Sequence, residues 1–185
     1  MSDRLPPIPE EAWTAEQRRC AREIIDGPRG ALVSPFVPLL RSPEFMSHVA
    51  RLGEYLRYRS AIGPRLSELA ILITARHWTQ QVEWAIHAPI AVREGVPQET
   101  VDAIATGARP VAMTEAEADV YDFCGELQRD RCVSDATWDR AVLRLGEQGA
   151  VDLIGIVGYY TLLSMVMNVA RTTVPASTAP PLPTR

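Results

Sequence analysis

Residues 64–95 read PRLSELAILITARHWTQQVEWAIHAPIAVREG. Within this stretch Glu83 and His87 are four residues apart, so on a helix they lie on one face, one turn from each other. A second acid, Glu68, lies on the helical run just before them. Two acids and an imidazole are unusual in an otherwise apolar stretch. The stretch therefore predicts both the centre of the fold and the location of the function.

Two helices are predicted within these residues. From Pro64 onward, apolar side chains recur at helical spacing, which predicts a helix with a broad buried face. We expect a break near Thr79, whose hydroxyl can cap a second helix that runs from Gln80 to Gly95. Glu83 would then lie early in the second helix, with His87 one turn further on.

The rest of the chain also reads as helices. The capping boxes Thr14–Gln17 and Thr114–Glu117 predict helices that end near Asp26 and Arg131. No stretch alternates as a strand does, so we expect an all-α fold. Further helices are predicted from Ser42 to near Ser60, from Pro97 to Gly107, from Ser134 through Trp138 and Leu143, and from Gln148 to Arg171. The last of these is apolar nearly all round, which predicts burial in the core or against another subunit.

The length of 185 residues fits a single domain with a substantial core. We expect this domain to span residues 14–172. Residues 1–13 and 173–185 are rich in proline. The first of these segments is predicted to be extended, and the second to be a mobile tail.

Composition narrows the class of protein. A hydrophobic fraction of 46% and a charged fraction of 23% are ordinary for soluble globular proteins. The net charge of −4 and the lack of a basic run with aromatics argue against a nucleic-acid partner. The apolar run 153–169 is interrupted by glycine and polar residues, which favours a buried helix over a membrane span. The N-terminus lacks the apolar core of an export signal, so we expect a cytoplasmic protein.

The three cysteines, Cys20, Cys124 and Cys132, form neither a C-x-x-C motif nor a metal-ligand pattern. They read as reduced thiols. One histidine with two acids is weak support for zinc, so we expect no metal site and no cofactor.

The spacing of Glu68, Gln80, Glu83 and His87 resembles the carboxymuconolactone decarboxylase and alkyl hydroperoxidase D superfamily. This resemblance covers about residues 44–170 and implies an AhpD-like helical bundle that assembles as a trimer or hexamer. In the peroxidase branch a glutamate precedes a C-x-x-C, with a histidine four residues after the second cysteine. Here the cysteine positions hold Gln80 and Glu83, which cannot form a redox dithiol. The chain is therefore more similar to the decarboxylase branch.

The residues suit acid–base chemistry on a small carboxylate or lactone. Decarboxylation beside an unsaturated lactone leaves a dienolate, which must be protonated. His87 can supply that proton, Glu83 can orient and charge the ring, and Glu68 would be a second acid of the pocket. A cation should hold the substrate carboxylate, and Arg57, Arg59, Arg65 and Arg76 are candidates. The residues expected to contact substrate are Gln80, Trp84, Arg65, Arg76 and Tyr160.

Other interpretations use the same sequence. Lactone hydrolysis or isomerisation would need the same acid–base residues. A hydroperoxidase-type antioxidant could use Cys132, whose thiol pKa Arg129 and Arg131 could lower. A non-catalytic, oligomeric small-molecule-binding protein would keep the pocket without turnover. Tyr160 and Trp84 would equally serve as core residues, Glu68 as a structural acid, and a Glu–His pair at this spacing as a surface ion pair.

Overall fold

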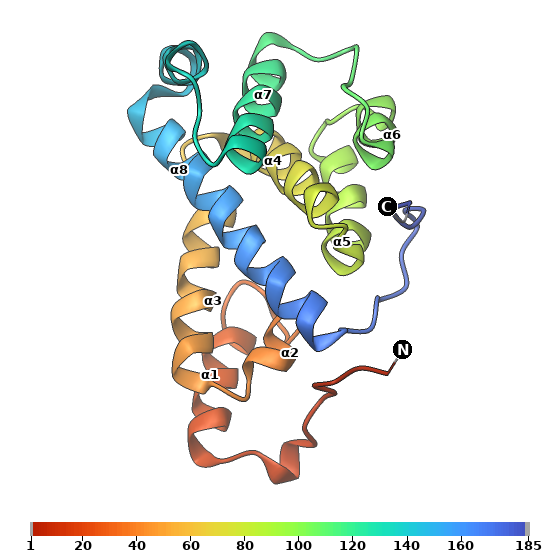
Figure 1. Cartoon of the computed structure of the whole chain (residues 1–185). Helices are drawn as coiled ribbons and strands as arrows, with labels where there is room; N and C mark the ends of the chain where they lie inside the picture. Colours follow the sequence, from red (N-terminus) through yellow and green to blue (C-terminus); the bar gives the residue numbers. More distant parts are fainter. Residues whose placement is uncertain (1, 184–185) are drawn as a thin grey trace.

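The computed structural model describes residues 2–183, and every regular element within them is a helix (Figure 1). This confirms the all-α prediction. A short 3₁₀ turn at Glu10–Ala12 precedes the first helix. The helices are α1 (Ala15–Ile25), α2 (Phe36–Leu39), α3 (Pro43–Tyr58), α4 (Gly63–His77), α5 (Gln81–Arg93), α6 (Gln98–Thr106), α7 (Glu115–Asp130) and α8 (Asp135–Ala170).

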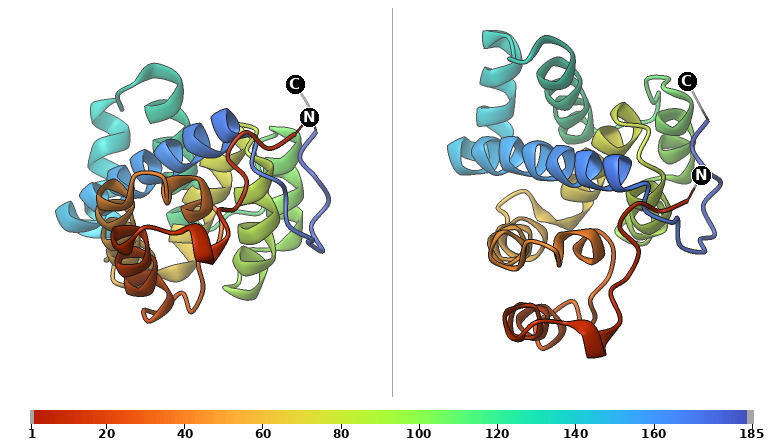
Figure 2. Two further views of the ribbon diagram at one scale, coloured as in Figure 1. Left: turned by 90° about the horizontal axis from the view of Figure 1, so that it is seen from below. Right: turned by 60° about the horizontal axis from the view of Figure 1, so that its bottom comes forward.

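Helix α8 consists of two helical segments joined at Gly146, which has φ 70° and ψ 168°. The two predicted helices are therefore both present. The second segment runs through the middle of the molecule, between α1–α3 on one side and α4–α7 on the other (Figures 1 and 2). Among the described residues, α8 is the one helix long and apolar enough to span a membrane, and 56% of its most apolar window is buried. Its central position in the bundle accounts for its composition.

Helix α4 is buried over an unusually long run. Every residue from Ser67 to Ala75 is buried, because α5, α7 and α8 all pack against this helix. The predicted broad apolar face thus extends around most of the helix. Glu68 lies within this run, which places an acid inside the core.

The turn between α4 and α5 differs by one residue from the prediction. Thr79 takes a left-handed conformation with φ 48°, so the extended N-cap conformation falls on Gln80 instead. The Gln80 side chain accepts a hydrogen bond from the backbone N–H of Val82. Gln80, and not Thr79, therefore caps α5.

The C-terminal tail is docked on the bundle, in contrast to the predicted mobile tail. Its residue Leu182 is 3% exposed and exchanges two hydrogen bonds of 2.9 Å with the side chain of Gln81. At the other end of the chain, the Arg4 backbone N–H donates to Ala170 at 2.7 Å. The outermost residues of the two predicted terminal segments, 1 and 184–185, lie outside the described part of the chain.

Candidate functional site

His87 lies between two glutamates in the core of the bundle. Its Nδ1 is 2.7 Å from Oε2 of Glu68, and its Nε2 is 3.3 Å from Oε2 of Glu83. The residue exposures are 4% for Glu68, 2% for Glu83 and 3% for His87. A surface ion pair is therefore excluded, and buried charges of this kind require one another.

Local structure explains this grouping. Glu83 and His87 are one turn apart on α5, as the spacing predicts. The turn at residues 78–80 folds α5 back along α4, which brings Glu68 to the other ring nitrogen. Glu68 is thus the nearer acid to the imidazole. Glu68 therefore contacts the imidazole, whereas a purely structural acid would be expected to bind an arginine or backbone amides.

The two acids determine the charge of the imidazole. Burial by itself lowers the pKa of His87, but the neighbouring Glu68 and Glu83 outweigh burial and raise this pKa to about 9. His87 is therefore an imidazolium at neutral pH, with protons on both ring nitrogens.

The raised pKa predicts that stability falls with pH. His87 binds its proton more tightly in the folded chain than in the unfolded chain, where its pKa is near 6.5. Its contribution is fully present below pH 6.5 and is lost as the pH rises through about 9. The loss in the free energy of unfolding should be on the order of 3 kcal/mol. Urea unfolding at a series of pH values between 6 and 10 measures this loss in the free energy of unfolding.

A His87→Gln variant is the control for this experiment. It removes the titrating ring and keeps a hydrogen-bonding side chain, so its stability should change less over the same pH range. Parallel curves for the two proteins would contradict the assigned charge of His87.

A small cavity of about 50 Å³ opens beside the imidazole. Glu83 lines it, and the Oε1 atom of Glu83 is buried without a hydrogen-bond partner among the described residues. An unpaired buried oxygen of this kind is costly, so it indicates a place for a donor from outside the chain. The charged, imidazole and phenol side chains that line the cavity are those of Arg29, Arg57, Glu83, His87, Tyr159 and Tyr160.

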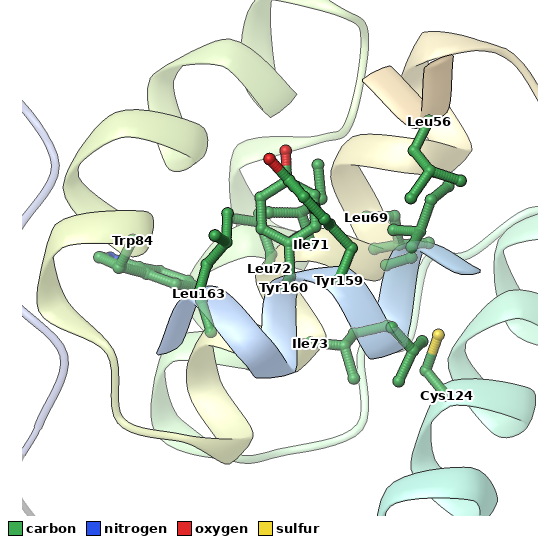
Figure 3. Packing of buried hydrophobic residues seen from close by; sticks show 14 of the residues in the cluster. Leu56, Leu69, Ile71, Leu72, Ile73, Trp84, Cys124, Tyr159, Tyr160 and Leu163 are labelled. Atoms are coloured by element: carbon green, nitrogen blue, oxygen red, sulfur yellow. The ribbon is translucent and has the colours of Figure 1, made fainter. Parts of the chain in front are cut away.

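Two tyrosines from α8 form one wall of this cavity. Tyr160 meets the His87 ring edge to face, with centroids 5.2 Å apart, and meets Tyr159 in the same way. Figure 3 shows both phenol oxygens directed to the same side of α8. Burial raises the pKa of Tyr159 to about 12, against the opposing effect of Arg29, and raises the pKa of Tyr160 well above its usual value. Both hydroxyls therefore stay protonated and can donate hydrogen bonds.

The structure places two of the expected substrate-contacting residues elsewhere. Gln80 uses its side chain to cap α5 and to donate to Asn168 at 2.8 Å. The indole N–H of Trp84 donates to the Pro180 carbonyl at 3.0 Å, and its ring lines a separate apolar groove of about 680 Å³ beneath the tail. That groove is larger than the His87 cavity but contains none of the acid–base residues.

The two arginines that were expected to contact substrate also lie elsewhere. Arg65 pairs with Glu117 at 2.8 Å, and Arg76 donates to the Pro183 carbonyl at 3.2 Å. Neither lines the His87 cavity. Arg57, another of the candidate arginines, does line the cavity. Arg29 also lines it, although Arg29 was not among the candidates expected from the sequence. Arg29 lies in the irregular segment between α1 and α2, where no periodicity or motif indicates an orientation.

Comparison with known protein families finds one match. Residues 43–124 match the family model described as the carboxymuconolactone decarboxylase family. This part of the chain is similar to that family. The matched range contains Arg57, Glu68, Glu83 and His87, while Arg29 and the two tyrosines of the cavity lie outside it.

Solved structures show the same fold. The ligand-free debrominase Bmp8 is 14% identical, with a TM-score of 0.72 over 93% of this chain and 92% of that chain. A cysteine-to-alanine variant of Bmp8, in complex with 2,3,4-tribromopyrrole, is also 14% identical, with a TM-score of 0.73 over 95% and 94% of the two chains. No curated protein sequence matches significantly. The chain therefore shares the all-helical fold of these structures.

Proposed function

We propose that this protein is a cofactor-independent acid–base enzyme that decarboxylates a small cyclic carboxylate or lactone. The observation that carries the proposal is the buried Glu68–His87–Glu83 group. Within this group Glu83 lines a cavity and has an oxygen, Oε1, without a hydrogen-bond partner among the described residues. The match to the carboxymuconolactone decarboxylase family, over a range that includes all three residues, supports the same class of chemistry.

The proposed step needs one proton. The bond between the ring carbon and the substrate carboxylate breaks, carbon dioxide leaves, and the electron pair moves into the unsaturated lactone as a dienolate. The N–H at Nε2 of His87 then protonates carbon, which leaves neutral imidazole. Nε2 lies on the side of Glu83 and has the longer of the two contacts, so its proton is the one held less tightly. Reprotonation from solvent restores the imidazolium.

Glu68 would act on the opposite nitrogen. At 2.7 Å from Nδ1, it fixes the orientation of the ring and stabilises the charged form from which the proton is given. Because Glu68 does not line the cavity, we assign it a positioning role. Glu83 faces the cavity and would contact the substrate through its free Oε1.

The thiol alternative receives no support from this geometry. Cys20 and Cys124 are buried, and Cys132 is exposed at the end of α7. Burial raises the pKa of the Cys124 thiol well above its usual range. No cysteine of the described chain lines the His87 cavity. Peroxide reduction by a thiolate is therefore not proposed.

Turnover of γ-carboxymuconolactone, followed by ultraviolet absorbance and carbon dioxide release, tests the proposal. We expect turnover by the wild type and a loss of about 10²–10⁴-fold in His87→Gln, the range typical of a general acid. The control is His48→Gln, an exposed histidine on α3, which should retain activity. Absorbance change without carbon dioxide would indicate hydrolysis or isomerisation by the same residues. No change with folded wild type would overturn decarboxylation of this lactone.

A further inference from the structure

Two arginines from different elements line the cavity beside His87. Arg57 comes from the last turn of α3, and Arg29 comes from the segment between α1 and α2. We infer that Arg29 and Arg57 form the binding site for the carboxylate of a small ligand at this cavity. The inference rests on the proposed function in using the same cavity, but it concerns recognition and not the proton transfer.

Neither guanidinium is neutralised within the chain. Across residues 2–183, no carboxylate lies within ion-pair distance of Arg29 or Arg57, although both side chains are half-buried. Elsewhere, half-exposed arginines such as Arg65 and Arg140 are paired with buried acids. Half-buried cations that lack a carboxylate partner favour an anionic ligand.

The charge balance indicates a negatively charged ligand. The imidazolium and the two guanidinium groups face two glutamates, Glu68 and Glu83, which leaves one net positive charge. A carboxylate neutralises this excess. The planar fork of arginine also matches a carboxylate.

The walls of the cavity offer aromatic contacts to a ligand ring. The Arg29 guanidinium lies over the Phe36 ring at 4.9 Å from its centroid, and the Tyr160 ring stands on the opposite helix. Glu83 Oε1 offers an acceptor for a ligand hydroxyl or N–H. The present volume of about 50 Å³ is smaller than the roughly 150 Å³ that holds benzene. A ring can therefore enter only if side chains that line the cavity move.

Binding of furan-2-carboxylate, with its uncharged methyl ester as the comparison probe, tests this site without turnover. In an NMR titration the acid should bind the wild type at least tenfold more tightly than the ester. Arg29→Leu and Arg57→Leu should each weaken binding of the acid by about 10–100-fold, the range for charge-assisted hydrogen bonds. Arg29→Lys and Arg57→Lys should weaken it less, since they keep the charge. Binding of the ester should change little in any variant.

The control variant is Arg22→Leu, which removes an exposed arginine of α1 and should leave binding unchanged. Folding of each variant is checked by circular dichroism and melting temperature. Equal binding of acid and ester, unchanged binding in Arg29→Leu or Arg57→Leu, or tighter binding of inorganic phosphate would each overturn the inference. Lactone turnover that is unaffected in the arginine variants would overturn it while leaving the proposed function in place. Selective acid binding without lactone turnover would support the inference and contradict decarboxylation of this lactone.

Discussion

Replacing Glu68 by alanine is expected to destabilise the protein by about 3–5 kcal/mol at pH 6, the range for breaking a buried ion pair. The reason is its contact with His87: the two side chains are 2.7 Å apart and only 4–5% exposed. Without Glu68 the imidazolium loses its strongest stabilising neighbour, and burial then favours the neutral ring. Urea unfolding at pH 6 measures the loss directly.

The pH dependence of the Glu68→Ala variant provides a second readout. The difference from wild type should shrink above pH 9, because the wild-type ring is also neutral there. Glu54→Ala is the matched control: it removes a half-buried acid from α3 that has no ion pair among the described residues, and its cost should be well below that of Glu68→Ala. A double-mutant cycle of Glu68→Gln with His87→Gln isolates the pair. A coupling energy near zero would contradict the assigned ion pair.

Gly53→Ala is expected to disrupt the cavity although it removes no charged group. Gly53 lies on α3 against the phenol of Tyr159, and a Cβ added here would overlap the phenol oxygen and its ring carbon. The added atom would also lie 2.9 Å from Nη2 of Arg29. Tyr159 and Arg29 would both have to move. We expect a loss of about 1–3 kcal/mol from overpacking, together with at least a tenfold loss in furan-2-carboxylate binding, as for loss of a charge-assisted contact.

Gly125→Ala is the matched control for this substitution. Gly125 is inside α7, and an added Cβ would meet no atom within 4 Å. Alanine should stabilise that helix by up to about 1 kcal/mol and leave binding unchanged. In the Gly53→Ala background, Tyr159→Leu should recover part of the stability, because it removes the overlapping atoms. Normal stability and binding in Gly53→Ala would show that the close approach of Tyr159 to Gly53 is needed neither for folding nor for ligand binding.

Local patterns determined most of the fold. The capping boxes at Thr14 and Thr114 are both formed, since they depend only on residues three apart along the chain. The separation of the last two helices was likewise predictable, and it occurs at Gly146, where a positive φ suits glycine. The cap at Gln80 was missed by one residue, because the left-handed conformation of Thr79 depends on how α5 folds back against α4.

The sequence by itself determined the all-helical class, the family resemblance and the placing of Glu83 and His87 on one face of a helix. Helical periodicity is a local property, so it can be read from a single stretch. Only the tertiary structure decided that Glu68 holds the far side of the imidazole and that Arg29 and Arg57, not Arg65 and Arg76, line the cavity. Arginine side chains are long, and their direction depends on contacts distant in sequence, so spacing along the chain cannot select among them.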